Sequence, residues 1–202
     1  MSNLILGEDG KSRCNWSNAA PDFLHYHDSE WGFPVDNDTR LFEKICLESF
    51  QSGLSWRTIL TKRENFRTAF AGFDFYKVAA FDQEDEQRLM QDSGIVRNKR
   101  KIAATINNAK CAIEMIEQEG SLAAFLWRYR TLPEQERAPQ SQTTSVQSHA
   151  LAKALKKRGW QFVGPTTAFA FMQAMGLLND HVEGCFVRDR IERVRLKFNI
   201  PA

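Results

Sequence analysis

Hydrophobic side chains recur at helical spacing along most of the chain. The clearest run is 98–117, where apolar residues return every three or four positions until Gly120 ends the pattern. Its apolar positions are Ile102, Ile106, Ala109, Ile113 and Ile116. Similar spacing predicts helices over 41–50 and 148–157. The best strand candidate, 160–163, is too short to found a sheet, so the pattern predicts an all-α fold.

Individual residues refine these helices. Asp38 or Thr39 is expected to cap the helix over 41–50, because short polar side chains accept hydrogen bonds from the first turn. Pro165, which follows a glycine, is expected to open another helix, since proline is tolerated in a first turn. Cys46 and Cys111 fall at apolar helix positions, and we therefore expect both in the core.

The pattern divides the chain into one large domain and two tails. Residues 131–147 are polar, contain prolines and have almost no large apolar side chains, which predicts a long loop between two helical parts. We expect a flexible tail over 1–12, a single domain over 13–185, and a basic tail over 186–202 with five basic and two acidic residues.

Composition excludes several classes of protein. Hydrophobic residues make up 43% and charged residues 26%, which is ordinary for a globular protein. No apolar run approaches the ~18 residues of a membrane span, and the N-terminal sequence lacks the pattern of a secretory signal. The four cysteines form no C-x-x-C pair, so a disulfide scaffold is not indicated. We expect a cytoplasmic protein without a membrane segment.

The charge is small but unevenly distributed. The formal net charge is only +2, yet the segments 93–110 and 138–179 carry basic residues and no acidic ones. Each segment alone is typical of a solvated helix face. Together they favour a positively charged side of the molecule, as a protein that binds a polyanion needs.

Two cysteine–histidine pairs lie at opposite ends of the chain. Cys14 and His27 form the first pair, and His181 and Cys185 form the second, with three residues between them. Two cysteines with two histidines match a closed tetrahedral zinc site, although two buried cysteines and two ordinary histidines, all unrelated, remain an equal alternative on spacing alone. His181 also begins the H-x-E half of a zinc deaminase signature, but the C-x-x-C that this chemistry needs is missing.

A short turn between two predicted helices is a candidate for phosphate binding. The segment Leu89–Lys101 reads LMQDSGIVRNKRK, and Gly94 in its turn would expose backbone N–H groups beside the start of the next helix. Arg97, Lys99 and Lys101 add positive charge for a DNA backbone. This segment resembles a helix-hairpin-helix element. The alternative is that Gly94 simply ends a helix.

Three longer motifs carry a family resemblance. They are Tyr26–Gly32 (YHDSEWG), Cys46–Trp56 (CLESFQSGLSW) and Lys156–Thr166 (KKRGWQFVGPT), with Cys14–Trp16 (CNW) before them and Asn179–Val182 (NDHV) after them. In order and spacing they resemble the bacterial type I, constitutive DNA-3-methyladenine glycosylases over about residues 13–185. That resemblance implies a helix-hairpin-helix glycosylase fold with one structural zinc ion held by the two cysteine–histidine pairs.

The resemblance also assigns roles to single residues. The family's base pocket corresponds to Glu48, Trp16, Tyr26 and Trp56, and Leu54 corresponds to the side chain that fills the gap left by an extruded base. Two departures affect the pocket wall: Ser49 stands where glycine is common in the family, and Phe23 stands where some relatives have tyrosine.

These residue types suit the implied reaction. 3-Methyladenine in DNA is cationic, so its glycosidic bond is weakened, and aromatic faces and a carboxylate can hold a flat cation after base flipping. The expected partner is double-stranded DNA containing alkylated adenine, and the expected state is a monomer. A non-catalytic sensor of alkylated DNA and a zinc-stabilised DNA-binding regulator are the rival functions.

One absence bears on the chemistry. Residues 93–179 contain no aspartate, whereas other helix-hairpin-helix glycosylases use one after the hairpin. Glu114, Glu117 and Glu119 are the carboxylates that could replace it. No lysine stands out as a Schiff-base nucleophile. We therefore expect a monofunctional glycosylase without lyase activity, whose rate depends on the charge of its substrate.

Overall fold

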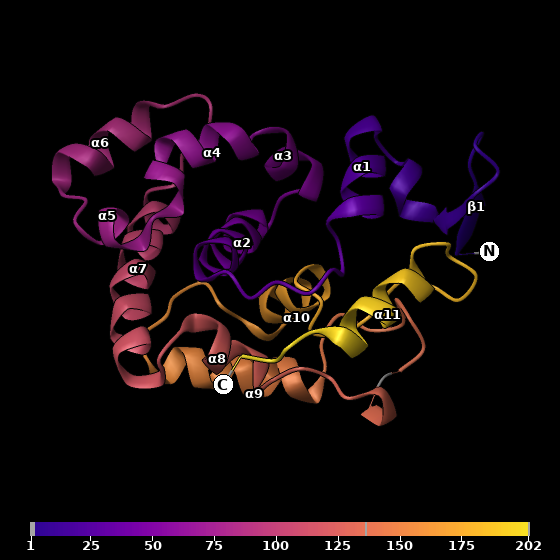
Figure 1. The fold of residues 1–202 in the computed structure, drawn as a ribbon. Helices are drawn as coiled ribbons and strands as arrows, with labels where there is room; N and C mark the ends of the chain where they lie inside the picture. Colours follow the sequence, from indigo (N-terminus) through magenta and orange to yellow (C-terminus); the bar gives the residue numbers. More distant parts are fainter. Residues whose placement is uncertain (1–2, 136, 202) are drawn as a thin grey trace.

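Helices dominate the computed structural model, which describes residues 3–135 and 137–201 (Figure 1). The α-helices are α1 (Pro21–Ser29), α2 (Asp38–Gln51), α3 (Trp56–Thr61), α4 (Arg63–Ala69), α5 (Phe75–Ala79), α6 (Gln83–Gln91), α7 (Lys99–Glu119), α8 (Leu122–Trp127), α9 (Val146–Lys157), α10 (Pro165–Ala174) and α11 (Arg188–Lys197). Short 3₁₀ helices are η1 (Asn15–Asn18), η2 (Ala71–Phe73) and η3 (Pro133–Gln135). The strands β1 (Leu4–Leu6) and β2 (Ser12–Cys14) are three residues each. The predicted helix-rich fold is confirmed.

Helix α2 is the central element of the molecule. It contacts α3, α7, α8 and α10, and every residue from Leu41 to Phe50 is buried (Figure 1). Its N-cap is Asn37, whose side chain accepts from the Arg40 N–H, so the expected caps Asp38 and Thr39 are wrong. Asp38 instead accepts from the Ala123 N–H at the start of α8. A helix buried on all sides can place a polar side chain deep inside the molecule.

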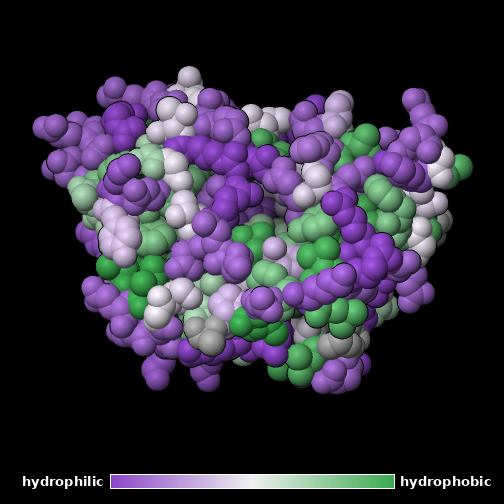
Figure 2. Space-filling model, viewed as in Figure 1, coloured by the Kyte–Doolittle hydropathy of each residue, from purple (hydrophilic) through white to green (hydrophobic). Residues whose placement is uncertain are grey.

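A cluster of phenylalanines fixes the side of α2 that faces α4 and η2. Phe50 packs on Phe66 with ring centroids 4.7 Å apart, and Phe70 stacks on Phe73 at 5.6 Å. Cys46 and Cys111 are buried as expected. On the face shown in Figure 2, hydrophilic side chains cover most of the periphery, and apolar side chains gather toward the centre and lower part of the view. Within the described residues, no helix combines the length and apolar composition needed to cross a membrane.

The N-terminal segment differs from the flexible tail expected over 1–12. Residues 4–14 form a hairpin in which β1 pairs antiparallel with β2, and Leu4 lies opposite Cys14. The Phe186 N–H donates to the Ser12 carbonyl at 2.9 Å, which ties this hairpin to the C-terminal region. Residues 1–2 lie outside the described residues. Periodicity could not show this hairpin, because three-residue strands are too short to produce a pattern.

The C-terminal segment, expected as a basic tail over 186–202, packs on the rest of the molecule. It contains α11, which buries Ile191, and Phe198 packs on Trp127 with ring centroids 4.5 Å apart. The strand candidate at 160–163 forms no strand. The polar loop expected over 131–147 includes η3 and gives way to α9 at Val146, where Ser145 forms a capping box.

Candidate active site and metal centre

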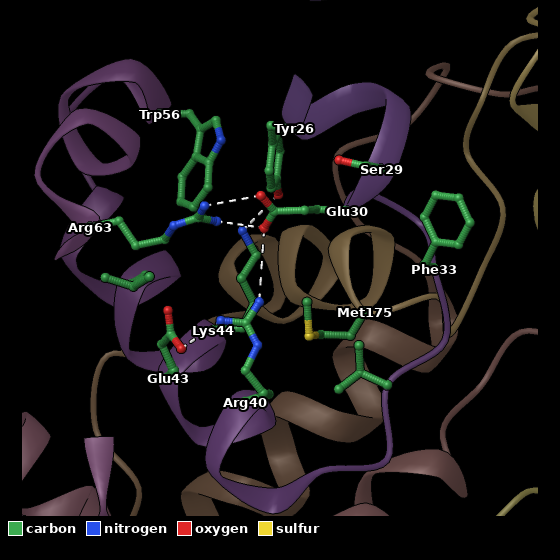
Figure 3. A pocket seen from close by; sticks show the side chains of 12 residues that line it. Tyr26, Ser29, Glu30, Phe33, Arg40, Glu43, Lys44, Trp56, Arg63 and Met175 are labelled. Atoms are coloured by element: carbon green, nitrogen blue, oxygen red, sulfur yellow. Dashed lines mark hydrogen bonds and ion pairs between the residues drawn. The ribbon is translucent and has the colours of Figure 1, made fainter. Parts of the chain in front are cut away.

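Two neighbouring cavities lie between α1, α2 and α3. The first, here called the aromatic pocket, has a volume of about 270 Å³ and is lined by Trp16, Phe23, Tyr26, Trp31, Glu48, Gln51, Trp56, Ala170 and Gln173. The second, here called the charged pocket, is shown in Figure 3, and among its lining residues are Glu30, Arg40, Glu43, Lys44 and Arg63. Tyr26 and Trp56 line both cavities and therefore form the wall between them.

The aromatic pocket brings together the four residues expected to bind a base. Trp16 comes from η1, Tyr26 from α1, Glu48 from the last turn of α2, and Trp56 from the first turn of α3. Tyr26 and Trp56 have ring centroids 5.3 Å apart, and Trp16 and Tyr26 6.4 Å. Glu48 lines the pocket and is only 5% exposed, so its carboxylate is largely shielded from solvent. Rings around a buried carboxylate suit a flat, electron-poor ligand.

The two departures from the family pattern have different consequences. Ser49 is buried, and its hydroxyl donates to the Ile45 carbonyl at 2.7 Å and the Phe162 carbonyl at 3.1 Å. It is not among the lining residues of the aromatic pocket. Phe23 does line that pocket and packs edge-on against Trp16 at 5.9 Å. Pocket shape therefore depends on Phe23, which lacks the hydroxyl of a tyrosine.

Lys44 is the main residue of this site that the sequence analysis missed. It lies one helical turn before Glu48, and its ammonium is 2.7 Å from the Glu48 Oε1 atom. The same ammonium donates to the Tyr26 hydroxyl at 2.8 Å and lies 3.5 Å from the centre of the Trp56 ring. Burial lowers the pKa of Lys44, and the charge of Glu48 acts in the opposite direction. Burial also raises the pKa of Tyr26, so its hydroxyl stays protonated and can donate.

The carboxylates of the charged pocket are held by arginines. Arg63 is paired with Glu30 at 2.6 Å, and Arg40 is paired with Glu43 at 2.7 Å (Figure 3). Arg67 also reaches Glu43 at 2.8 Å. Burial tends to raise the pKa of Glu30, but the hydrogen bonds and charge of Arg63 outweigh it, and the pKa is lowered. Both carboxylates therefore already have partners other than Lys44.

The turn between α2 and α3 presents Leu54 to solvent. Gly53 has a φ of 82°, a left-handed conformation that glycine adopts without strain, and the following Leu54 is 42% exposed. The Leu54 N–H donates to the Gln51 carbonyl at 2.6 Å. Leu54 is therefore an exposed apolar side chain on a tight turn.

Lys101 does not lie where a DNA-backbone contact requires. Its side chain is 7% exposed, and its ammonium donates to the Phe50 carbonyl at 2.8 Å and the Ser52 carbonyl at 2.6 Å. These carbonyls end α2, where backbone acceptors lack partners within the helix. Lys101 therefore caps α2 next to Leu54, and its expected role at a phosphate is wrong because its charge is already engaged inside the protein.

The predicted phosphate-binding turn connects α6 to α7 over 92–98. Arg97 and Lys99 are exposed there, as a backbone contact requires. The Gly94 N–H donates to the Asp92 carboxylate at 2.7 Å, so this amide is already engaged. The Gly94 carbonyl accepts from Lys62, which links the turn to the end of α3.

The two cysteine–histidine pairs meet in one buried cluster. The ligand atoms of Cys14, His27, His181 and Cys185 all lie within 4.8 Å of one another. The Sγ–N distances are 3.7 Å for Cys14–His181, 3.6 Å for Cys185–His27 and 3.5 Å for Cys185–His181. Tetrahedral zinc with ordinary bond lengths separates sulfur and nitrogen ligands by ~3.6 Å, so the four residues fit a metal ion of that size.

The outer partners of the histidines fix which ring nitrogen faces the cluster. His27 Nδ1 lies 2.8 Å from the Asp28 carboxylate, and His181 Nε2 lies 3.0 Å from the Trp31 carbonyl. Each ring therefore donates outward and turns its other nitrogen inward, as metal-binding histidines do. The neighbouring Cys14 thiol lowers the pKa of Cys185, and both histidines add to this effect, which favours a thiolate.

Comparison with known proteins agrees with this geometry. A sequence profile described as methyladenine glycosylase matches residues 16–188. The chain belongs to the methyladenine glycosylase family. It is 48% identical to DNA-3-methyladenine glycosylase 1 of Escherichia coli (strain K12) over 179 residues, which are 86% of this chain and 95% of that protein. It is 42% identical to DNA-3-methyladenine glycosylase of Haemophilus influenzae, over 86% of this chain and 96% of that one. The predicted family is confirmed.

Solved structures of methyladenine glycosylases have the same fold. The 3-methyladenine DNA glycosylase I of Staphylococcus aureus matches with a TM-score of 0.81 and 36% identity, over 87% of this chain and 96% of that one. A tyrosine-to-phenylalanine variant of a 3-methyladenine DNA glycosylase I, solved in complex with 3-methyladenine, matches with a TM-score of 0.79 and 34% identity, over 87% of this chain and 97% of that one.

The aromatic pocket contains a single carboxylate. Among its lining residues, all of which the structure describes, Glu48 is the only acid. Glu119 pairs with Arg128 at 2.7 Å and Arg158 at 2.6 Å, and both arginines lower its pKa. Glu114 and Glu117 are exposed on α7. None of these three glutamates lines the pocket in place of the missing aspartate. Gln51 and Gln173 do line it, and sequence spacing had not indicated either one.

Proposed function

We propose that this chain is a DNA-3-methyladenine glycosylase that flips the damaged base into the aromatic pocket and hydrolyses its N-glycosidic bond. The observation that carries the proposal is the buried Glu48 carboxylate among Trp16, Tyr26 and Trp56, in a chain of the methyladenine glycosylase family. The rings stack on the flat base, and Glu48 accepts hydrogen bonds from its edge.

The reaction follows from the charge of the substrate. When the bond between C1′ of the sugar and N9 breaks, its electron pair neutralises the cationic ring, and the base leaves as neutral 3-methyladenine. Water adds to C1′ and loses a proton, which leaves an abasic site. This needs less help from the protein than the release of a neutral lesion, which requires leaving-group activation worth ~10²–10⁴-fold. A lyase step needs an amine that attacks C1′, and no lysine is among the lining residues of the aromatic pocket, which suits a monofunctional enzyme.

DNA is held from two sides in this proposal. Leu54, exposed on its turn, enters the duplex and fills the space that the flipped base leaves. The α6–turn–α7 unit acts as a helix-hairpin-helix element, in which Arg97 and Lys99 contact the phosphates. Gly94 contributes its small size, since an added Cβ would lie 2.9 Å from the Asp92 carboxylate and 3.1 Å from Asn65. The substrate is double-stranded DNA, and the protein acts as a monomer.

The metal in this proposal is one structural zinc ion. Two cysteines and two histidines, all buried, leave no open position for substrate, which distinguishes a structural from a catalytic site. Cys14 and His27 come from the first part of the chain, and His181 and Cys185 from the last, so the ion would fasten the N-terminal hairpin and α1 to the segment before α11. The free cysteines and the DNA substrate favour the cytoplasm.

Base release tests the enzyme against its rivals. The protein is incubated with duplex DNA that contains 3-methyladenine, and the soluble fraction is analysed chromatographically for the free base. We expect catalytic release of 3-methyladenine and no strand cleavage before alkali is added. A sensor of alkylated DNA would bind this duplex without releasing base. A regulator would prefer one sequence of undamaged DNA, and either result would refute the proposal.

A further inference from the structure

A buried cation lies behind the wall of the aromatic pocket. The Lys44 ammonium lies 2.7 Å from the Glu48 carboxylate, 3.5 Å from the centre of the Trp56 ring and 5.0 Å from that of the Tyr26 ring. Lys44 is itself buried. These are the same carboxylate and two of the same rings that are expected to receive the cationic base. Lys44 reaches them from the side of the charged pocket, across the wall that the two cavities share.

Glu48 is the counter-ion of Lys44. The two acids that line the charged pocket, Glu30 and Glu43, are paired with arginines. A buried ammonium needs an ionised partner and hydrogen-bond acceptors, and Lys44 finds both in Glu48 and the Tyr26 hydroxyl. The Lys44–Glu48 pair therefore gives this end of the aromatic pocket a net charge close to zero.

This neutrality matters because the reaction removes charge from the base. An unpaired carboxylate would stabilise the cationic base in the bound substrate and lose that interaction as the base becomes neutral. Such an interaction strengthens substrate binding but raises the barrier, because only interactions that grow toward the transition state accelerate the reaction. A carboxylate that is neutralised by a neighbouring ammonium keeps its hydrogen-bonding oxygens without this effect.

We propose that Lys44 is a specificity-determining and positioning residue, which neutralises Glu48 so that the pocket binds a cationic base and its neutral product about equally well. Selection of cationic lesions then takes place in the bond-breaking step rather than in binding. This inference rests on the proposed function, because it assumes that the aromatic pocket receives the base.

The test varies the charge of the pocket over three values. Lys44→Met changes the net charge of the Lys44–Glu48 pair from zero to −1, Glu48→Gln changes it to +1, and the double variant restores zero. Two probes are titrated by tryptophan fluorescence: 3-methyladenine, which is neutral, and 3,9-dimethyladeninium, a cation with a methyl group in place of the sugar. Lys153→Met, which changes an exposed lysine on α9, is the matched control.

We expect the ratio of cation affinity to neutral-base affinity to follow the charge. Wild type, the control and the double variant should give ratios within a few-fold of one another. Lys44→Met should raise the ratio by at least about tenfold and Glu48→Gln should lower it by a similar factor, because a unit charge at short range in a partly buried site has an effect of this size or larger. In single-turnover release from DNA at saturating enzyme, Lys44→Met should be slower than wild type although it binds the cation more tightly.

Other outcomes separate the two proposals. If wild type binds neither probe, the pocket is misassigned, and both this inference and the proposed function fail. If wild type binds both probes but Lys44→Met changes their ratio less than threefold, only the role of Lys44 is refuted. If Lys44 has a purely structural role, Lys44→Met should lower the affinity for both probes and the release rate together, and this result would also refute the proposed role of Lys44. If Lys44→Met does not fold, Glu48→Gln and the double variant, which contains no unpaired buried carboxylate, decide the result.

Discussion

Replacing Lys101 by methionine tests whether this residue caps α2, as the structure indicates, or contacts a DNA phosphate, as its basic sequence surroundings predicted. Methionine keeps the length of the aliphatic chain but removes the ammonium, which donates to the Phe50 and Ser52 carbonyls at 2.8 and 2.6 Å. Both carbonyls lie at the C-terminal end of α2, where the partial charge of the helix is negative. The variant therefore removes a cap from the central helix and leaves the exposed basic residues of the turn unchanged.

The expected loss of stability can be estimated from these two hydrogen bonds. A hydrogen bond to a charged group contributes ~1.5–3 kcal/mol, and two such bonds set the upper limit of the loss. Lys101 is buried, which removes part of the hydration of its ammonium and lowers its pKa, and the loss of this desolvation cost in the variant offsets part of the destabilisation. We expect the free energy of unfolding to fall by ~2–4 kcal/mol. For a domain of this size the melting temperature should then fall by roughly 5–15 °C.

Urea denaturation and salt-dependent duplex binding together test this prediction. Lys101→Met should be less stable and should keep the wild-type slope of binding affinity against salt concentration. The control, Lys99→Met, changes an exposed residue two positions earlier, so its stability should stay within ~0.5 kcal/mol of wild type. If Lys99 contacts a phosphate, the slope of log affinity against log salt concentration should decrease in magnitude by about one for this variant. A Lys101→Met protein with wild-type stability and a reduced salt slope would refute the capping role.

Three further predictions concern metal, DNA and substrate range. Purified protein should contain one zinc ion, and Cys185→Ser should lower both the metal content and the melting temperature. Zinc-binding free energies of ~10–16 kcal/mol far exceed the entropic cost of ~4–5 kcal/mol for closing a loop of about 150 residues. Elemental analysis that finds no metal would contradict this prediction. Leu54→Ala should slow release from duplex DNA by about tenfold or more and affect single-stranded DNA much less, because a wedge acts on stacked bases; equal slowing on both would exclude it. Hypoxanthine should not be released and 7-methylguanine only weakly, and rapid hypoxanthine release would reveal a catalytic group outside the assigned pocket.

Helix positions followed from the sequence because each long helix carries a complete local signal. The helix expected over 98–117 spans Lys99–Glu119, and Pro165 begins α10 as expected. The hairpin formed by β1 and β2 has no such signal, because its stability depends on contacts with residues far away in the chain, such as Phe186. The N-cap of α2 was misplaced by one residue, because Asn37 and Asp38 are equally good caps in isolation.

The cysteines and histidines of the buried cluster could be singled out from their spacing, and the aromatic residues of the pocket from the family resemblance, before their geometry was known. Cysteine and histidine pairs have a chemistry that few alternatives share, and the four side chains of the two pairs converge in one cluster. Lysine is different, because its role depends on what surrounds it. Lys101 belongs to a basic run and yet is buried as a helix cap, whereas Lys44 stands one helical turn before Glu48 on a helix that is buried on all sides. Periodicity treats both as solvated side chains, and only the packing of α2 shows otherwise.

The most direct test of the central claim is the single-turnover release of 3-methyladenine from duplex DNA by wild type and by Glu48→Gln. Glu117→Gln, which changes an exposed glutamate on α7, is the matched control for the substitution. The account predicts rapid release by wild type and Glu117→Gln. Release by Glu48→Gln should be slower by at least about tenfold, because the amide has one acceptor oxygen in place of two and orients the base edge less well, while the affinity for undamaged duplex stays almost unchanged. Release by Glu48→Gln at the wild-type rate would show that the aromatic pocket is not where the base is cleaved.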